Sequence, residues 1–256
     1  MPQQNSVDLA VNRWSAWAPG LNDSESWQEW LGGARDIAGP VDPDVSFVKP
    51  LLRRRLSPLN RMAFHVASKC LPDEETPICI FCSRYGEYGR AFEILSDLSR
   101  GEAISPNSFS LSVHNTTSSL FSIARNDRSH STSIAAGAAT LEAGFLEARS
   151  LLSEAPAAAA LLVYYDEPLP ALYEERVHAI RESAALAMLL RLPQRNEPDN
   201  RVFRLAWKSS DAKGTVEKDS THPALRLARL LSNACPMASL NDGRLLWTWS
   251  RHVTAN

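Results

Sequence analysis

Apolar and polar residues alternate along the chain in patterns that predict several strands. Residues 7–17 carry apolar side chains at alternating positions and end at Pro19-Gly20, which predicts a strand followed by a turn. Residues 158–165 form a continuous apolar run, which is typical of a strand buried on both faces. From these signals we expect strands over residues 7–17, 78–83, 129–135, 158–165, 185–192 and 243–253.

Apolar residues spaced three and four apart predict helices between the strands. We expect helices over residues 27–31, 59–67, 90–98 and 222–234, a helical or turn segment over 105–124, and an alanine-rich helix running to residue 148. The alternation predicts an α/β protein, with a mixed β-sheet covered by helices in a single domain over residues 1–256. The polar residues 209–221 are expected to form a flexible loop.

The stretch over residues 130–148 predicts a strand, a tight turn and a helix in immediate succession. Enzymes often place a nucleophile on such a turn, because the first N–H groups of the helix stabilise a thiolate or an oxyanion there. This chain has Ile134, Ala135, Ala136 and Gly137 at the turn, and none of these side chains is a nucleophile. The stretch therefore predicts the architecture of a nucleophile elbow without its chemistry.

Composition excludes several classes of function. The net charge of -2 and a pI near 6.3 provide no positive field for nucleic acid, so no nucleic-acid partner is expected. The N-terminal residues show no export or transit signal, and the longest apolar run is far shorter than the roughly 20 residues of a membrane span. We expect a cytoplasmic protein without a membrane span.

The cysteines include one CxxC pair, Cys79 and Cys82, in an apolar segment that favours a strand. Residues three apart on a strand point to opposite faces, so these two thiols are not expected to share a metal ion. We expect buried, reduced cysteines, and neither a metal site nor a cofactor. The acidic pair Asp166-Glu167, which follows a strand, is interpreted as exposed loop charge.

Two motifs together resemble the N-terminal half of the β-ketoacyl synthases, the condensing enzymes of the thiolase fold. SPNSFSLSVHN over residues 105–115 is similar to the Ser-Pro motif that opens a helix beside the subunit interface in those enzymes. TSIAAG over residues 132–137 lies where they carry a Thr-Ala-Cys-x-x-Gly nucleophile motif. In that register Ile134 replaces the catalytic cysteine, and Ala135 is the other possible occupant.

The resemblance implies a thiolase-like half-fold that lacks the C-terminal half of the condensing enzymes. That half supplies their histidines, and His222 and His252 lie in no similar motif here. The chain is most similar to short chain-length-factor-like subunits of aryl polyene and related type II fatty acid or polyketide pathways. Such a subunit pairs with an active β-ketoacyl synthase and shapes its acyl tunnel, which implies a non-catalytic partner whose strand over residues 129–135 pairs across the interface.

The same resemblance assigns roles to individual residues. Those expected to form the acyl tunnel or the interface are Ser108, Phe109, Leu111, Ser112, Val113, Asn115, Ser131 and Ser133. Ordinary helix packing within the chain is the alternative for residues 108–113. The basic run Arg53, Arg54 and Arg55 is a candidate contact for an acyl carrier protein, with a solvated or salt-bridged surface as its alternative.

Two other functions remain open from the sequence. One is an autonomous acyltransferase or thioesterase that uses Ser133, Cys82 or His114; a hydrogen-bonded structural role is the alternative for His114. The other is a homodimer that binds free lipid in its own interface.

Overall fold

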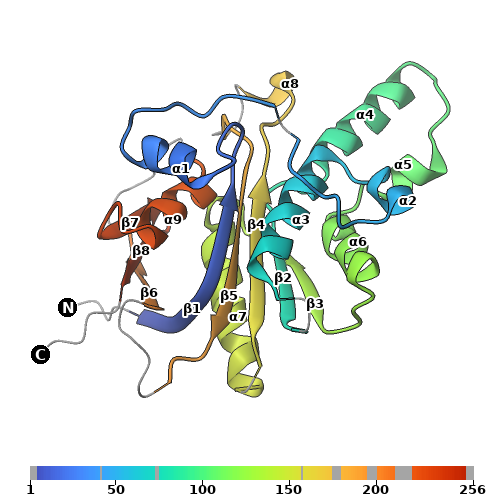
Figure 1. Cartoon of the computed structure of the whole chain (residues 1–256). Helices are drawn as coiled ribbons and strands as arrows, with labels where there is room; N and C mark the ends of the chain where they lie inside the picture. The colour runs from blue at the N-terminus through green and yellow to red at the C-terminus, as the bar shows by residue number, and fades with distance from the viewer. Residues whose placement is uncertain are drawn as a thin grey trace, which may run out of the picture.

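The computed structural model describes residues 5–40, 42–72, 75–156, 158–174, 180–194, 201–210 and 221–251. In this part of the chain one mixed sheet carries helices on both faces (Figure 1). Its strands are β1 (Asn5–Trp17), β2 (Ile78–Cys82), β3 (Ser131–Ile134), β4 (Ala160–Asp166), β5 (Ala184–Arg191), β6 (Val202–Ser209), β7 (Met237–Asn241) and β8 (Leu245–Arg251). They are ordered β3-β2-β4-β5-β1-β6-β8-β7.

The helices begin where the sequence supplies N-terminal caps and prolines. Ser57 caps α3, since its hydroxyl accepts a hydrogen bond from the Asn60 N–H, and Pro58 fills the first helical position. The helices are α1 (Ser24–Leu31), α2 (Pro50–Arg53), α3 (Pro58–Cys70), α4 (Tyr88–Ser99), α5 (Pro106–Ser110), α6 (Thr116–Arg125), α7 (Thr140–Glu154), α8 (Ala171–Glu174) and α9 (Pro223–Leu231), with a 3-10 turn at Gly137–Ala139.

The sequence-based expectations match most of these elements. The segment over residues 105–124 is two helices, α5 and α6, rather than one. Strands β6 and β7 were not predicted. Residues 211–220 of the predicted loop lie outside the described residues.

Two apolar cores lie on opposite faces of the sheet. Helices α7, α9 and α1 cover one face, and α2, α3 and α6 cover the other. Every residue of β4 is buried, which explains its continuous apolar run. Cys82 belongs to the first core and Cys79 to the second, so the prediction that they point to opposite faces is confirmed.

Strand β1 joins the two parts of the sheet. Its first residues pair with β6, from Asn5 to Ala10, and its later residues pair with β5, from Ala10 to Trp17. The register shifts between Val11 and Arg13, where the strand changes partner. Strands β3, β2 and β4 run parallel to one another, whereas all other pairs in the sheet are antiparallel.

Helix α7 contacts the parallel strands and β8 through two consecutive residues. Gly144 lies against Cys82 of β2 and Leu162 of β4, so closely that a side chain at Gly144 would collide with the Cys82 sulfur. Phe145 meets Trp249 of β8 edge to face, with ring centroids 4.7 Å apart. The absence of a side chain at Gly144 is thus what sets the distance between α7 and the parallel strands.

We expect the substitution Gly144→Ala to lower the free energy of unfolding by about 1–3 kcal/mol, because the overpacking outweighs the gain in helix propensity. In a Cys82→Ala background the same substitution should be less costly, since the sulfur that the new methyl group meets is gone. Urea denaturation of the four proteins in this double-mutant cycle measures the coupling. Gly89→Ala in α4 is the control, because the added methyl group meets its nearest neighbour at 3.6 Å. Equal costs in both backgrounds would contradict this packing.

Candidate functional site

The elbow between β3 and α7 lies at the surface. Ala135, Ala136 and Gly137 are exposed, and Gly137 has a φ of 60°, a left-handed conformation that favours glycine. The Thr140 hydroxyl accepts a hydrogen bond from the Ala136 N–H at 2.9 Å and donates one to the Gly137 carbonyl at 2.7 Å. A main-chain donor at the turn is therefore already occupied by the chain's own side chain.

The two side chains at the expected cysteine position are hydrocarbons, and the thiol paired with them across the strands is buried. Ile134 is half-buried and packs on the first core, and Ala135 is a methyl group exposed to solvent. Cys82 pairs with Ile134 in the register of β2 and β3, but it is fully buried. Burial raises the pKa of the Cys82 thiol, which keeps it protonated and unreactive.

Strand β3 is an edge of the sheet, as predicted for the stretch over residues 129–135. The Cys79 N–H donates to the His130 carbonyl at 2.9 Å, and the Ser83 N–H donates to the Ile134 carbonyl at 3.2 Å. Even-numbered residues thus turn their backbone groups toward β2. Ser131 and Ser133 consequently turn theirs toward the open edge, where another strand can pair with them.

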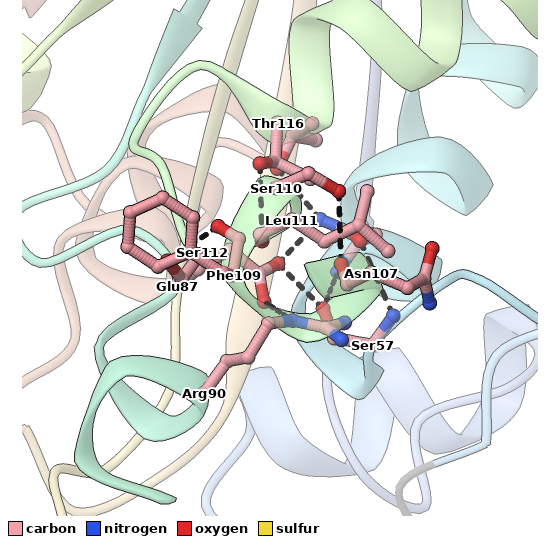
Figure 2. Close-up of polar contacts among 11 residues, drawn as sticks. Ser57, Glu87, Arg90, Asn107, Phe109, Ser110, Leu111, Ser112 and Thr116 are labelled. Atoms are coloured by element: carbon pink, nitrogen blue, oxygen red, sulfur yellow. Dashed lines mark hydrogen bonds and ion pairs between the residues drawn. The ribbon is translucent and has the colours of Figure 1, made fainter. Parts of the chain in front are cut away.

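The segment over residues 105–115 is held by its own hydrogen bonds. Ser112 Oγ donates to the Phe109 carbonyl at 2.9 Å, and Thr116 Oγ1 donates to the Leu111 carbonyl at 3.1 Å (Figure 2). Leu111 is buried in the second core, whereas Phe109 is 64% and Val113 48% exposed.

The remaining expected residues of this segment lie around α5 and α6. Ser108 is half-buried, and its N–H donates to Ser105 Oγ at 3.4 Å. Asn115 is exposed at the start of α6, where its side chain makes no capping hydrogen bond. Ser118 on α6 joins this segment to the sheet edge, because its hydroxyl lies 3.1 Å from the Ser133 hydroxyl. The structure therefore brings the two resemblance motifs side by side.

Glu87 anchors the helices behind α5, a role that the sequence did not indicate. Its carboxylate is 4% exposed and accepts hydrogen bonds from Ser57 Oγ and Asn60 Nδ2, both at 2.7 Å. Figure 2 shows Ser57 and Arg90 directed at it, with Arg90 Nε at 3.1 Å. Asn60 also donates to Thr117 Oγ1 at 2.8 Å, so Glu87 links α3, α4 and α6.

Asp166 holds the loop that follows β2. It is buried, which corrects the interpretation as exposed loop charge, and burial raises the pKa of its carboxyl group. The carboxylate accepts hydrogen bonds from Ser83 Oγ at 2.7 Å, the Arg84 N–H at 3.1 Å and the Tyr164 hydroxyl at 2.6 Å. The loop that follows β2, beside the elbow, is therefore held in place by the buried Asp166 side chain.

The two histidines near this loop have structural partners. His114 Nε2 donates to the Ser83 carbonyl at 2.8 Å, which confirms the hydrogen-bonded role. His222 Nδ1 accepts the Ala224 N–H at 3.2 Å, so its Nε2 carries the proton and donates to the Asp166 carbonyl at 3.2 Å. Burial lowers the pKa of His222 to about 4, so the ring is neutral at pH 7.

The basic run is divided between an internal and an external role. Arg53 donates from Nη2 to the Ser46 carbonyl at 2.7 Å and from Nε to the Val48 carbonyl at 3.2 Å, which holds the loop before α2. Arg54 and Arg55 are exposed. Of the three arginines, Arg54 and Arg55 are therefore the ones whose side chains can contact a partner.

Comparison with known proteins decides the family. Residues 27–250 match the family model of the β-ketoacyl synthase N-terminal domain. The chain belongs to this family. No match was found among the curated proteins.

Three solved structures of ketosynthases show the same fold. A ketosynthase (ApeO) in complex with its chain length factor (ApeC) from Xenorhabdus doucetiae matches with a TM-score of 0.80 and 24% identity, covering 96% of this chain and 100% of the matched chain. The ishigamide ketosynthase/chain length factor matches with a TM-score of 0.64 and 14% identity, covering 89% of this chain and 74% of the matched chain. The ketosynthase from module 6 of the bacillaene synthase from Bacillus subtilis 168 matches with a TM-score of 0.56 and 14% identity, covering 82% of this chain and 43% of the matched chain. The fold is thus the thiolase-like N-terminal half of a ketosynthase.

The described residues hold neither a cluster suited to a metal ion nor a helix able to cross a membrane. Within those ranges, no group of three or more His, Cys, Asp or Glu side chains is arranged to hold a metal ion. No helix there has the length and apolar character that crossing a bilayer requires.

Glu167 beside Asp166 makes stability depend on pH. Burial, with smaller effects of the Glu87 and Asp166 charges, raises the pKa of Glu167 to about 7 from 4.5. A carboxyl pKa that is higher in the folded protein favours folding at low pH, and this contribution is lost as the pH rises from about 4.5 to about 7. Glu167→Gln should therefore raise the melting temperature at pH 8 and change it little at pH 4, as measured by calorimetry. The exposed Glu93→Gln is the control, and an equal effect of Glu167→Gln at both pH values would contradict the shift.

Proposed function

We propose that this chain is a non-catalytic, chain-length-factor-like subunit that pairs with an active β-ketoacyl synthase. The observation that carries the proposal is the elbow, which keeps its strand, turn and helix while Ile134 and Ala135 stand where a nucleophile is needed. The hydrogen bond from the Ala136 N–H to Thr140 further reduces its capacity to stabilise an oxyanion. In this proposal the partner supplies the cysteine and the histidines.

The open edge at β3 supports the proposed pairing. Ser131 and Ser133 direct backbone donors and acceptors away from β2, and an unpaired edge of this kind is completed by a strand from another chain. The matched structure from Xenorhabdus doucetiae is described as a ketosynthase in complex with its chain length factor. We therefore place the shared interface along β3 and the neighbouring α6.

The exposed side chains of the Ser-Pro segment support a role in shaping the partner's tunnel. Phe109 and Val113 expose apolar surface on the segment that precedes α6, while Leu111 is buried in the chain's own core. Ser108 and Ser112 are half-buried beside them, so added bulk there would narrow a pocket built against this surface.

Arg54 and Arg55 form the basic part of a proposed carrier-protein contact. They are exposed beside Phe47 and Leu51, whose side chains are 49% and 79% exposed. A surface that combines arginines with apolar residues suits an acidic helix with an apolar face. Arg53 is excluded from this contact, because it holds the loop before α2.

We expect Ser131→Pro to weaken capture of the ketosynthase partner by about tenfold or more, because proline removes a backbone donor that faces the open edge. The readout is co-expression with the ketosynthase encoded nearest to this chain, followed by affinity capture and native mass determination. Ser131→Thr is the matched control, since it keeps the donor. A one-to-one complex formed equally well by both variants would exclude β3 as the pairing strand, and a homodimer that ignores the ketosynthase would favour the lipid-binding alternative.

In the reconstituted complex, Ser112→Phe should shorten the acyl product, because the added ring fills space at the end of the proposed tunnel. Mass spectrometry of the products gives the chain length, and intact masses of both subunits locate the acyl thioester on the partner alone. Ser110→Phe on the exposed face of α5 is the control. Acyl mass on this chain would favour the autonomous enzyme, and unchanged product length with an intact complex would remove the tunnel role.

A further inference from the structure

A hollow of about 480 Å³ lies between α9, α1 and β7, at the end of the sheet opposite β3. These three elements lie together in Figure 1. Its volume is in the range of small-molecule sites. Because β3 and β7 are opposite edges of the sheet, this hollow is independent of the proposed ketosynthase interface.

Two arginines on one face of α9 line the hollow. Arg229 places its guanidinium 4.4 Å from the centre of the Trp30 ring, and among the described residues it has no carboxylate or hydrogen-bond acceptor. Arg226 lies beside it, and its Nη2 is 3.6 Å from an oxygen of the buried Glu142 carboxylate, a distance too long for a hydrogen bond. Arg229 is half-buried and keeps its charge and its donors for an oxygen ligand in the hollow.

The other walls limit which anion fits. Trp30, Ile37 and Met237 provide apolar surface, and Ser239 adds a hydroxyl group. Glu182 also lines the hollow and contributes a negative charge, which disfavours a dianion or a polyanion. A single carboxylate with a short apolar tail satisfies the arginines and the apolar walls and adds little repulsion with Glu182.

We propose that this hollow binds a small organic monoanion, with its carboxylate on Arg226 and Arg229 and its apolar tail on Trp30, Ile37 and Met237. The guanidinium of Arg229 is held in place by Trp30, so little side-chain freedom is lost when the carboxylate binds. Arg226 is likewise held, because its Nη2 lies 3.6 Å from the Glu142 carboxylate.

Cys235 provides a reporter for occupancy of the hollow. It lines the hollow and is half-buried, whereas Cys70, Cys79 and Cys82 are buried. A disulfide reagent applied to the native protein therefore reacts first at Cys235, and a bound ligand should slow this reaction.

The test measures the rate of Cys235 labelling by DTNB in the presence of hexanoate, hexyl phosphate or hexanol. Hexanoate should slow labelling with a saturable dependence, hexyl phosphate should do so less effectively, and hexanol should have little effect. Arg229→Met should raise the half-saturating concentration of hexanoate by about tenfold or more, because the charge-assisted hydrogen bonds are lost while the side-chain length is kept. The exposed Arg201→Met is the matched control and should behave as the unmodified protein.

Three results would overturn the proposal. The first is that hexanoate gives no protection at about 20 mM, where millimolar binding approaches saturation. The second is that hexanol protects Cys235 as well as hexanoate does. The third is that Arg229→Met leaves the affinity for hexanoate unchanged. Stronger protection by hexyl phosphate than by hexanoate would overturn the preference for a monoanion. None of these results depends on the ketosynthase, so failure here leaves the proposed function untouched.

Discussion

The pairing of β1 with two different strands is the constraint on which the rest of the structure depends. Its residues up to Ala10 extend the sheet toward β6, and those after Ala10 extend it toward β5. Without this strand the sheet that begins at β3 would end at β5, and α7 would lose the contact between Phe145 and Trp249 of β8. This thirteen-residue strand thus joins the two parts into a single sheet. The first apolar core extends along one face of that sheet.

Buried carboxylates hold the loop and the helices that follow β2, the neighbour of the elbow strand. Asp166 holds the loop after β2, and Glu87 holds the helices that follow it, each by several hydrogen bonds. Buried charged groups persist when every acceptor is satisfied in this way. A nucleophile on this scaffold would stand at the end of β3, where this chain has Ile134 and Ala135 beside the open edge of the sheet.

The two ends of the sheet have different characters. At β3 the backbone is unpaired and the neighbouring side chains are small or apolar, which suits association with another chain. At β7 the sheet edge is accompanied by α9 and its arginines, which suits a small charged ligand. The proposed pairing with a ketosynthase uses the first end and leaves the second free.

The sequence by itself determined the strands with continuous apolar runs, the elbow without a nucleophile, and the opposite faces of Cys79 and Cys82, because period and composition are local properties of a chain. It did not determine β6, whose partner β1 is distant in sequence. It also missed β7, which pairs with the next strand, β8, because a short alternating pattern is a weak signal. Nor did it show that Asp166 is buried, since a carboxylate after a strand looks the same in a loop and in a hydrogen-bonded interior. The tertiary structure alone decided that Arg53 holds a loop while its neighbours are exposed, and that Arg229 of α9 contacts Trp30. Burial and contact depend on which distant segments the fold brings together.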